Sequence, residues 1–84
     1  MTGNLHFKRG DVAVLSANVR RQDDWTGVSA RDVRRLLRHV GRKCVILGDA
    51  TGDGLYYDVA FTSGFKMDAL SGHHLDTPPR RARG

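Results

Sequence analysis

The chain has 84 residues, 39% of them hydrophobic, and its 14 lysines and arginines outnumber nine acidic residues to give a formal net charge of +5. This length allows one small domain with a limited core. The longest apolar run, residues 44–47, is far shorter than the roughly 20 residues that a membrane-spanning helix needs, so we expect no membrane partner. Residues 1–8 lack the apolar stretch of a signal peptide, and we expect a cytoplasmic protein.

The charged residues are unusual in kind as well as in number. Eleven of the cations are arginine, and every acidic residue is aspartate. The guanidinium group of arginine is planar and weakly hydrated, and it can pair with phosphate or carboxylate through two hydrogen bonds at once. The composition therefore favours an anionic partner.

The first expected element is a β-strand within residues 10–15, where Val12 and Val14 alternate with other residues. Residues 18–28 are polar and irregular, which predicts a loop, and they contain the only tryptophan, Trp25. A tryptophan in a loop either covers the core or presents its ring to a partner. We expect Trp25 to cover the core, and the second interpretation stays open.

The clearest element is a helix over about residues 30–40. Ser29 suits the N-cap position, and Asp32, three residues later, suits the positive end of the helix dipole. An apolar stripe at the spacing i, i+3, i+4 and i+7 follows, and Gly41 then supplies a C-terminal stop. The stripe consists of Val33, Leu36, Leu37 and Val40.

The opposite face of this helix is rich in arginine. Four arginines fall within about 60° of one another on a helical wheel, a fifth flanks them, and Asp32 is the only acid of the helix. A stripe of like charges is either a solvated face or a phosphate-binding surface. The four are Arg31, Arg35, Arg38 and Arg42, and the flanking residue is Arg34.

After Gly41 the hydrophobic period changes to two, which indicates strands joined by tight turns. In the most regular of these strands, Tyr57, Val59 and Phe61 are expected to face the core while Asp58 points outward. Hairpin connections force antiparallel pairing. The expected strands are 43–47, 55–62 and 65–70, with turns over 48–54 and 63–64.

The end of the sequence is basic. Residues 76–84 contain two prolines and three arginines with few apolar groups, a composition typical of a disordered tail. We therefore predict one domain over residues 1–75, followed by a basic C-terminal tail over residues 76–84. The tail arginines are Arg80, Arg81 and Arg83.

Several of these features resemble the SH3-like small barrels of bacterial modules. The sequence has a Gly10-Asp11 pair before a valine-rich strand, Gly41 before a β-rich run, a Tyr57-x-Val59-x-Phe61 strand, and a closing Leu75. The resemblance implies an α+β, mainly β fold, a small antiparallel SH3-like barrel of about 4–5 strands. The chain departs from that family where a capped helix replaces the loop after the first strand. Such barrels bind nucleic acid or dock proteins, so the resemblance concerns the fold and not the function.

Two patterns that suggest metal binding are incomplete. Asp49, Thr51, Asp53 and Gly54 match the first half of a calcium loop, but the twelfth position, which should be a bidentate glutamate, is Ala60. We interpret this segment as a hairpin turn. The adjacent pair His73–His74 would point to opposite faces of a strand, and no spaced ligand pair for zinc is present. We expect no metal and no cofactor.

The sequence also lacks catalytic signatures. It contains no nucleophile-elbow, phosphate-loop or zinc-protease motif. The single cysteine, Cys44, lies in a strand-like apolar run and is expected to be buried and inert. With no glutamate, paired-carboxylate chemistry would depend on aspartates that turns and caps already explain. We therefore expect a binding module and not an enzyme.

Two hypotheses about the partner follow. In the first, the module contacts nucleic acid or a nucleoprotein surface through the arginine face and the basic tail, with weak sequence specificity. In the alternative, it is a protein-interaction or assembly module, such as a phage or mobile-element accessory protein, that docks an acidic or apolar protein surface through the barrel or the loop. The first hypothesis uses Arg31, Arg34, Arg35, Arg38, Arg42, Arg80, Arg81 and Arg83, and the alternative uses Trp25 and Tyr56.

Overall fold

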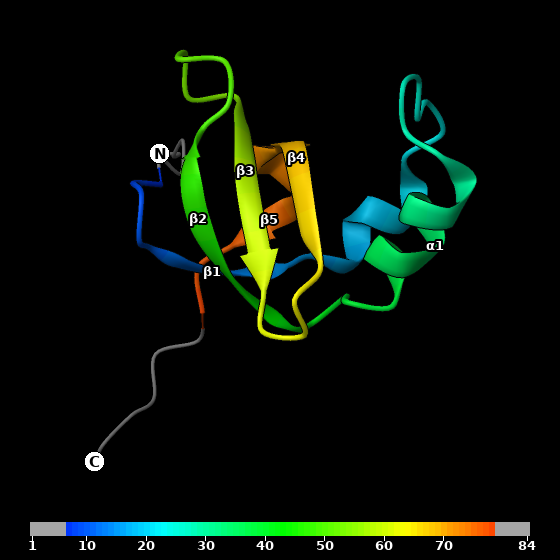
Figure 1. Ribbon diagram of the computed structural model, residues 1–84, viewed down its shortest axis with the longest axis horizontal. Helices are drawn as coiled ribbons and strands as arrows, with labels where there is room; N and C mark the ends of the chain where they lie inside the picture. The colour runs from blue at the N-terminus through cyan, green and yellow to red at the C-terminus, as the bar shows by residue number, and fades with distance from the viewer. Residues whose placement is uncertain (1–6, 79–84) are drawn as a thin grey trace.

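The computed structural model describes residues 7–78 and shows five antiparallel strands curled into a half-barrel, with one α-helix beside it (Figure 1). The strand order across the sheet is β4-β3-β2-β1-β5, so β4 and β5 form its two edges. The elements are β1 Val12–Leu15, η1 Ala17–Arg21, α1 Ala30–Leu37, β2 Lys43–Asp49, β3 Tyr56–Phe61, β4 Lys66–Ser71, η2 Gly72–His74 and β5 Leu75–Asp76.

The predicted fold class is confirmed. Residues 7–78 are mainly β with a single α-helix, and that helix follows the first strand. A small curled sheet of this kind is compatible with an SH3-like barrel. Within residues 7–78, no helix has the length and apolar character to cross a bilayer.

The core lies on the concave face of the sheet. The predicted alternation in β3 is confirmed, because Tyr57, Val59 and Phe61 are all buried there. In β2, Cys44 and Ile46 are buried on the same face. Side chains from every strand contribute to this single cluster, which is consistent with one cooperative core.

The start of α1 forms as predicted. The Ser29 hydroxyl accepts a hydrogen bond of 3.1 Å from the backbone N–H of Asp32, which satisfies one of the unpaired donors of the first turn. Leu36 is fully buried, and Leu37 and Val40 pack against the core cluster. The helix therefore docks on the half-barrel through its predicted apolar stripe.

The end of α1 differs from the prediction, since the helix stops at Leu37 and not near Val40. The backbone N–H of His39 bonds to the carbonyl of Leu36, three residues back, so the last turn tightens. Gly41 then takes a positive φ of 82°, and its N–H bonds to the carbonyl of Leu15 in β1. Capture of the chain by β1 ends the helix early.

The segment before α1 is more ordered than predicted. It contains the short 3-10 helix η1, which buries Val19. Trp25 packs against the core cluster, and its indole N–H donates a 3.0 Å hydrogen bond to the carbonyl of Gln22. The expectation that Trp25 covers the core is thus confirmed.

The boundary of the predicted tail also shifts. Asp76 pairs with Val14 as part of β5, so ordered structure continues past residue 75. Pairing with β1 explains the extension, because a strand at the sheet edge is defined by its partner more than by its own composition. The tail arginines Arg80, Arg81 and Arg83 lie outside the described residues.

Candidate functional site

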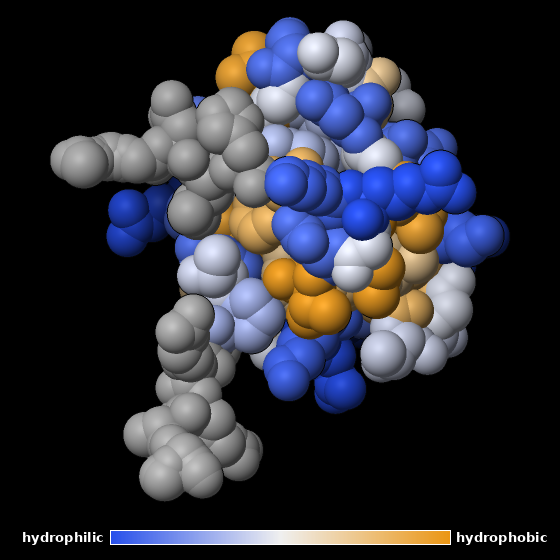
Figure 2. Space-filling view, turned by 90° about the vertical axis from the view of Figure 1, so that its left-hand side faces the viewer, coloured by the Kyte–Doolittle hydropathy of each residue, from blue (hydrophilic) through white to orange (hydrophobic). Residues whose placement is uncertain are grey.

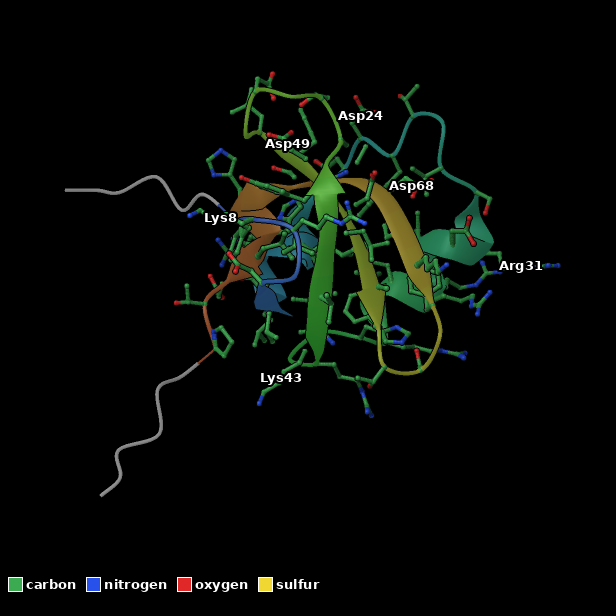
Figure 3. The ribbon with its side chains drawn as sticks, turned by 60° about the vertical axis from the view of Figure 1, so that its left-hand side comes forward. Lys8, Asp24, Arg31, Lys43, Asp49 and Asp68 are labelled. Carbon is green, nitrogen blue, oxygen red and sulfur yellow. The ribbon has the colours of Figure 1, made fainter. Side chains whose placement is uncertain are left out.

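The helix arginines are all at the surface. Arg31, Arg34 and Arg35 are exposed on α1, and Arg38, the C-cap residue, is exposed with helical backbone angles. In Figure 3 the side chain of Arg31 points away from the body of the molecule. Four of the five predicted arginines therefore share one short helix.

The fifth predicted residue, Arg42, is displaced from the helical stripe. It follows Gly41 and leads directly into β2, so it cannot lie one turn beyond Arg38 on the same helix. Its carbonyl accepts from the N–H of Leu15, and the residue is exposed. Arg42 thus sits at the end of the sheet to which the helix C-terminus is attached.

Two lysines join the arginines at this end. Lys43 begins β2, and Lys66 begins β4, just after the hairpin turn at Ser63. Both are exposed. Sequence reasoning missed them because isolated lysines in strands give no signal until the strands are aligned. We call this set the basic surface: Arg31, Arg34, Arg35, Arg38, Arg42, Lys43 and Lys66.

His39 and Arg35 attach the helix to the β3–β4 hairpin. The His39 ring nitrogens lie 2.7 Å from the Arg35 carbonyl and 2.7 Å from the Ser63 hydroxyl, and the ring lies against Phe61 and Phe65, with centroid distances of 4.5 and 5.1 Å. The Arg35 guanidinium lies 5.0 Å from the centre of the Phe65 ring, within the range of a cation–π interaction. These contacts therefore hold Arg35 and the end of α1 against the β3–β4 hairpin.

Strand β2 carries charges of opposite sign at its two ends. Figure 3 shows Asp24, Asp49 and Asp68 at one end and Lys43 at the other. The bounds of β2 agree, since Lys43 is its first residue and Asp49 is its last. Carboxylates also lie close to parts of the basic surface, because Asp32 is in the first turn of α1 and Asp68 follows Lys66 by two residues on β4.

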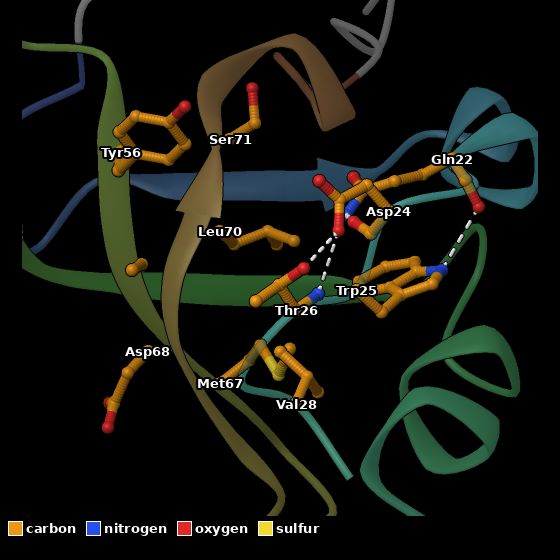
Figure 4. Close-up of a pocket in the computed structure, with 11 residues that line it drawn as sticks. Gln22, Asp24, Trp25, Thr26, Val28, Tyr56, Met67, Asp68, Leu70 and Ser71 are labelled. Atoms are coloured by element: carbon orange, nitrogen blue, oxygen red, sulfur yellow. Dashed lines mark hydrogen bonds between the residues drawn. The ribbon is translucent and has the colours of Figure 1, made fainter. Parts of the chain in front are cut away.

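The two aromatic residues of the alternative hypothesis meet at one groove. Trp25 and Tyr56 both line a cavity of about 230 Å³ between β4 and the loop before α1 (Figure 4). They are far apart in sequence, so only the fold brings them together. Met67, Leu70 and Val28 give the groove an apolar floor. We call it the Trp25 groove, and it is lined by Gln22, Asp24, Trp25, Thr26, Val28, Tyr56, Met67, Asp68, Ala69, Leu70 and Ser71.

A third surface feature is an exposed apolar strip on the convex face of the sheet. Val12 and Val45 are direct partners across β1 and β2, and Leu47 follows two residues along. They are 43%, 39% and 41% exposed. Figure 2, which views the molecule from the left of Figure 1, shows apolar atoms at the surface between charged groups. The strip arises because β2 is apolar on both faces while only one face is covered.

The segment that resembles half a calcium loop uses its carboxylates internally. Asp49 accepts hydrogen bonds from the backbone N–H groups of Thr51, Gly52 and Gly54, and Asp53 accepts from the Thr51 hydroxyl and the N–H of Leu55. These bonds satisfy backbone donors of the turn between β2 and β3. The interpretation as a hairpin turn is confirmed.

Cys44 is buried as predicted, and burial raises the pKa of its thiol to about 11. A thiol in this state has little thiolate at neutral pH. His73 is exposed, whereas the ring of His74 lies within 2.8 Å of Asn18 Oδ1 and 2.6 Å of Gln22 Oε1. Comparison with protein-family models, curated proteins and solved structures found no match to this chain.

Proposed function

We propose that this chain is a small, non-enzymatic SH3-like binding module that contacts nucleic acid, free or within a nucleoprotein, through the basic surface. The single observation that supports this most strongly is the set of seven exposed cations on α1 and its C-cap, before and at the start of β2, and at the start of β4. Phosphate is the ligand that a dense set of guanidinium groups recognises best.

The expected mode of binding is electrostatic. Each phosphate contact releases counterions, so affinity should fall steeply with salt. Three of the arginines lie on the two-turn helix α1 and a fourth is its C-cap. We expect these side chains to contact mainly the phosphate backbone, with weak sequence preference. The predicted contributions of Arg80, Arg81 and Arg83 would add reach beyond the described residues.

Fluorescence anisotropy with labelled duplex DNA, single-stranded DNA and RNA tests the proposal. The variant Arg31→Gln/Arg35→Gln/Arg38→Gln/Arg42→Gln should lose most binding and reduce the slope of log affinity against log salt by about 3 to 4, at about 0.9 per phosphate contact. The matched control neutralises four exposed cations elsewhere, as Lys8→Gln/Arg9→Gln/Arg20→Gln/Arg21→Gln. Equal losses in both variants, or no binding by the folded wild type at low salt, would contradict the proposal.

A second candidate function is protein docking, and the Trp25 groove favours it. Trp25 and Tyr56 are the aromatic residues that the alternative hypothesis named, and both line this groove. Aromatic anchors dominate most protein interfaces. If docking is the main function, Trp25→Ala should weaken partner binding more than any single arginine substitution.

A further inference from the structure

The Trp25 groove has a chemical character opposite to that of the basic surface. Two carboxylates, Asp24 and Asp68, line it, and no lysine or arginine does. Thr26 donates hydrogen bonds to Asp24 from its backbone and its hydroxyl (Figure 4), and these hold the pKa of that carboxyl below its usual value. Asp24 therefore keeps its negative charge near Trp25, whereas the side chain of Asp68 points away from both aromatic rings (Figure 4).

One wall of the groove is the open edge of the sheet. β4 is the last strand in the order β4-β3-β2-β1-β5, and it pairs with β3 on one side only. In an antiparallel strand, alternate residues direct their N–H and C=O groups to opposite sides, so part of the β4 backbone faces the groove. An open edge of this kind accepts an extended segment as an additional strand.

These features specify the ligand. The open edge requires an extended backbone, and the carboxylates of Asp24 and Asp68 favour cationic side chains. Guanidinium groups are also attracted to aromatic rings such as those of Trp25 and Tyr56, which are among the lining residues. An extended, arginine-rich peptide meets all three requirements.

The chain itself contains such a segment. Residues 77–84 read Thr-Pro-Pro-Arg-Arg-Ala-Arg-Gly, in which consecutive prolines favour an extended backbone and Arg80, Arg81 and Arg83 supply the charge. The described chain leaves the molecule beyond β5, on the side opposite the loop that carries Trp25 (Figure 1). That direction favours insertion into a neighbouring copy.

We propose that the Trp25 groove binds residues 77–84 of a second copy of this chain, with the segment lying along the open edge of β4. Two copies can exchange their segments reciprocally, or successive copies can bind head to tail. This contact does not depend on the proposed binding of nucleic acid. Each copy offers both the groove and the segment, so self-association requires no further component.

Sedimentation measurements without nucleic acid test self-association of the full chain. Wild type should associate as concentration rises, and the variant Arg80→Gln/Arg81→Gln/Arg83→Gln should stay monomeric over the same range. A wild type that remains monomeric, or a triple variant that associates equally well, would overturn the proposal. The comparison of DNA binding between wild type and the helix variant does not depend on the result of this experiment. The two proposals can therefore fail independently.

The single tryptophan makes the site of binding measurable. A synthetic peptide of residues 77–84, added to the triple variant, should shift the fluorescence of Trp25 in a saturable way. Asp68→Asn should weaken this binding by about three-fold, the scale of one exposed charge pair. The matched control Asp76→Asn, an exposed aspartate on β5 and outside the groove, should not weaken it.

Three results would overturn this assignment. The first is no change in Trp25 emission up to about 1 mM peptide, the weak limit of specific binding. The second is equal weakening by Asp68→Asn and Asp76→Asn. The third is a difference in Trp25 emission between monomeric wild type and the triple variant, independent of concentration, because it would place the segment in the groove of its own copy.

Discussion

At the scale of single residues, His39 has the largest consequence that sequence reasoning did not foresee. It lies just after the helix, where a histidine is ordinarily a surface residue, yet its ring contacts Phe61 and Phe65 and hydrogen-bonds to Ser63. These contacts join α1 to the β3–β4 hairpin and position Arg35 over Phe65. His39 therefore positions Arg35 and the end of α1 against the hairpin, although His39 is not itself part of the basic surface.

Replacing His39 tests this role. His39→Ala should lower the free energy of unfolding by about 1–2 kcal/mol, the sum expected for one hydrogen bond and one aromatic contact. Chemical denaturation followed by Trp25 fluorescence measures the change. His73→Ala, an exposed histidine on η2, is the control and should leave stability unchanged. A His39→Ala variant as stable as wild type would contradict the role.

At the scale of elements, β4 is distinguished by a bulge. The register between β3 and β4 shifts between Tyr57 and Val59, and Ala69 takes a φ of 55°, the only positive value at a non-glycine residue within residues 7–78. Asp58 stabilises the bulge by accepting a 2.9 Å hydrogen bond from the N–H of Ala69. The bulge bends β4 beside the Trp25 groove.

Glycine at this position should relieve the backbone strain. Ala69→Gly should raise the free energy of unfolding by about 0.5–1 kcal/mol, because glycine adopts positive φ without a Cβ clash. Ala60→Gly, in the regular part of β3, should lower the free energy of unfolding, because glycine there only increases the conformational entropy of the unfolded chain. Thermal unfolding of both variants measures the contrast, and destabilisation by Ala69→Gly would show that the strained φ is not the governing factor.

The elements that could be predicted are those specified by local patterns. The Ser29 cap, the apolar stripe that includes Leu36 and Leu37, and the alternation through Val59 all depend on residues within a few positions of one another. The end of α1 could not be predicted, because it is set by the pairing of Gly41 with Leu15 across the fold. Likewise β5 forms only because β1 offers it a partner.

The candidate site was predictable to a similar degree. The arginines of α1 were found because helical periodicity gathers them on one face. Lys66 joins them, and Tyr56 and Trp25 come to line one groove, only through tertiary contacts between distant segments. Periodicity carries no information about such contacts, so the basic surface was found in part and the groove was not anticipated.

At the scale of the whole molecule, charge is distributed asymmetrically. The net charge of +5 does not describe this distribution. Four exposed arginines lie on α1 and at its C-cap, while Asp24 and Asp49 lie at the end of the sheet opposite Lys43 (Figure 3). Such an arrangement orients the module in the field of a polyanion. If both proposed contacts form, one molecule would present the basic surface to nucleic acid and the Trp25 groove to another copy.

The central claim is that the basic surface is where nucleic acid binds, and an NMR titration tests it most directly. Amide signals of the full chain would be followed as unlabelled duplex DNA of mixed sequence is added. We expect the perturbed residues to lie in α1, in residues 38–43 and in the hairpin over residues 62–66, with smaller changes at higher salt. Perturbations centred on the Trp25 groove or on Val12, Val45 and Leu47, or none at low salt, would contradict the account.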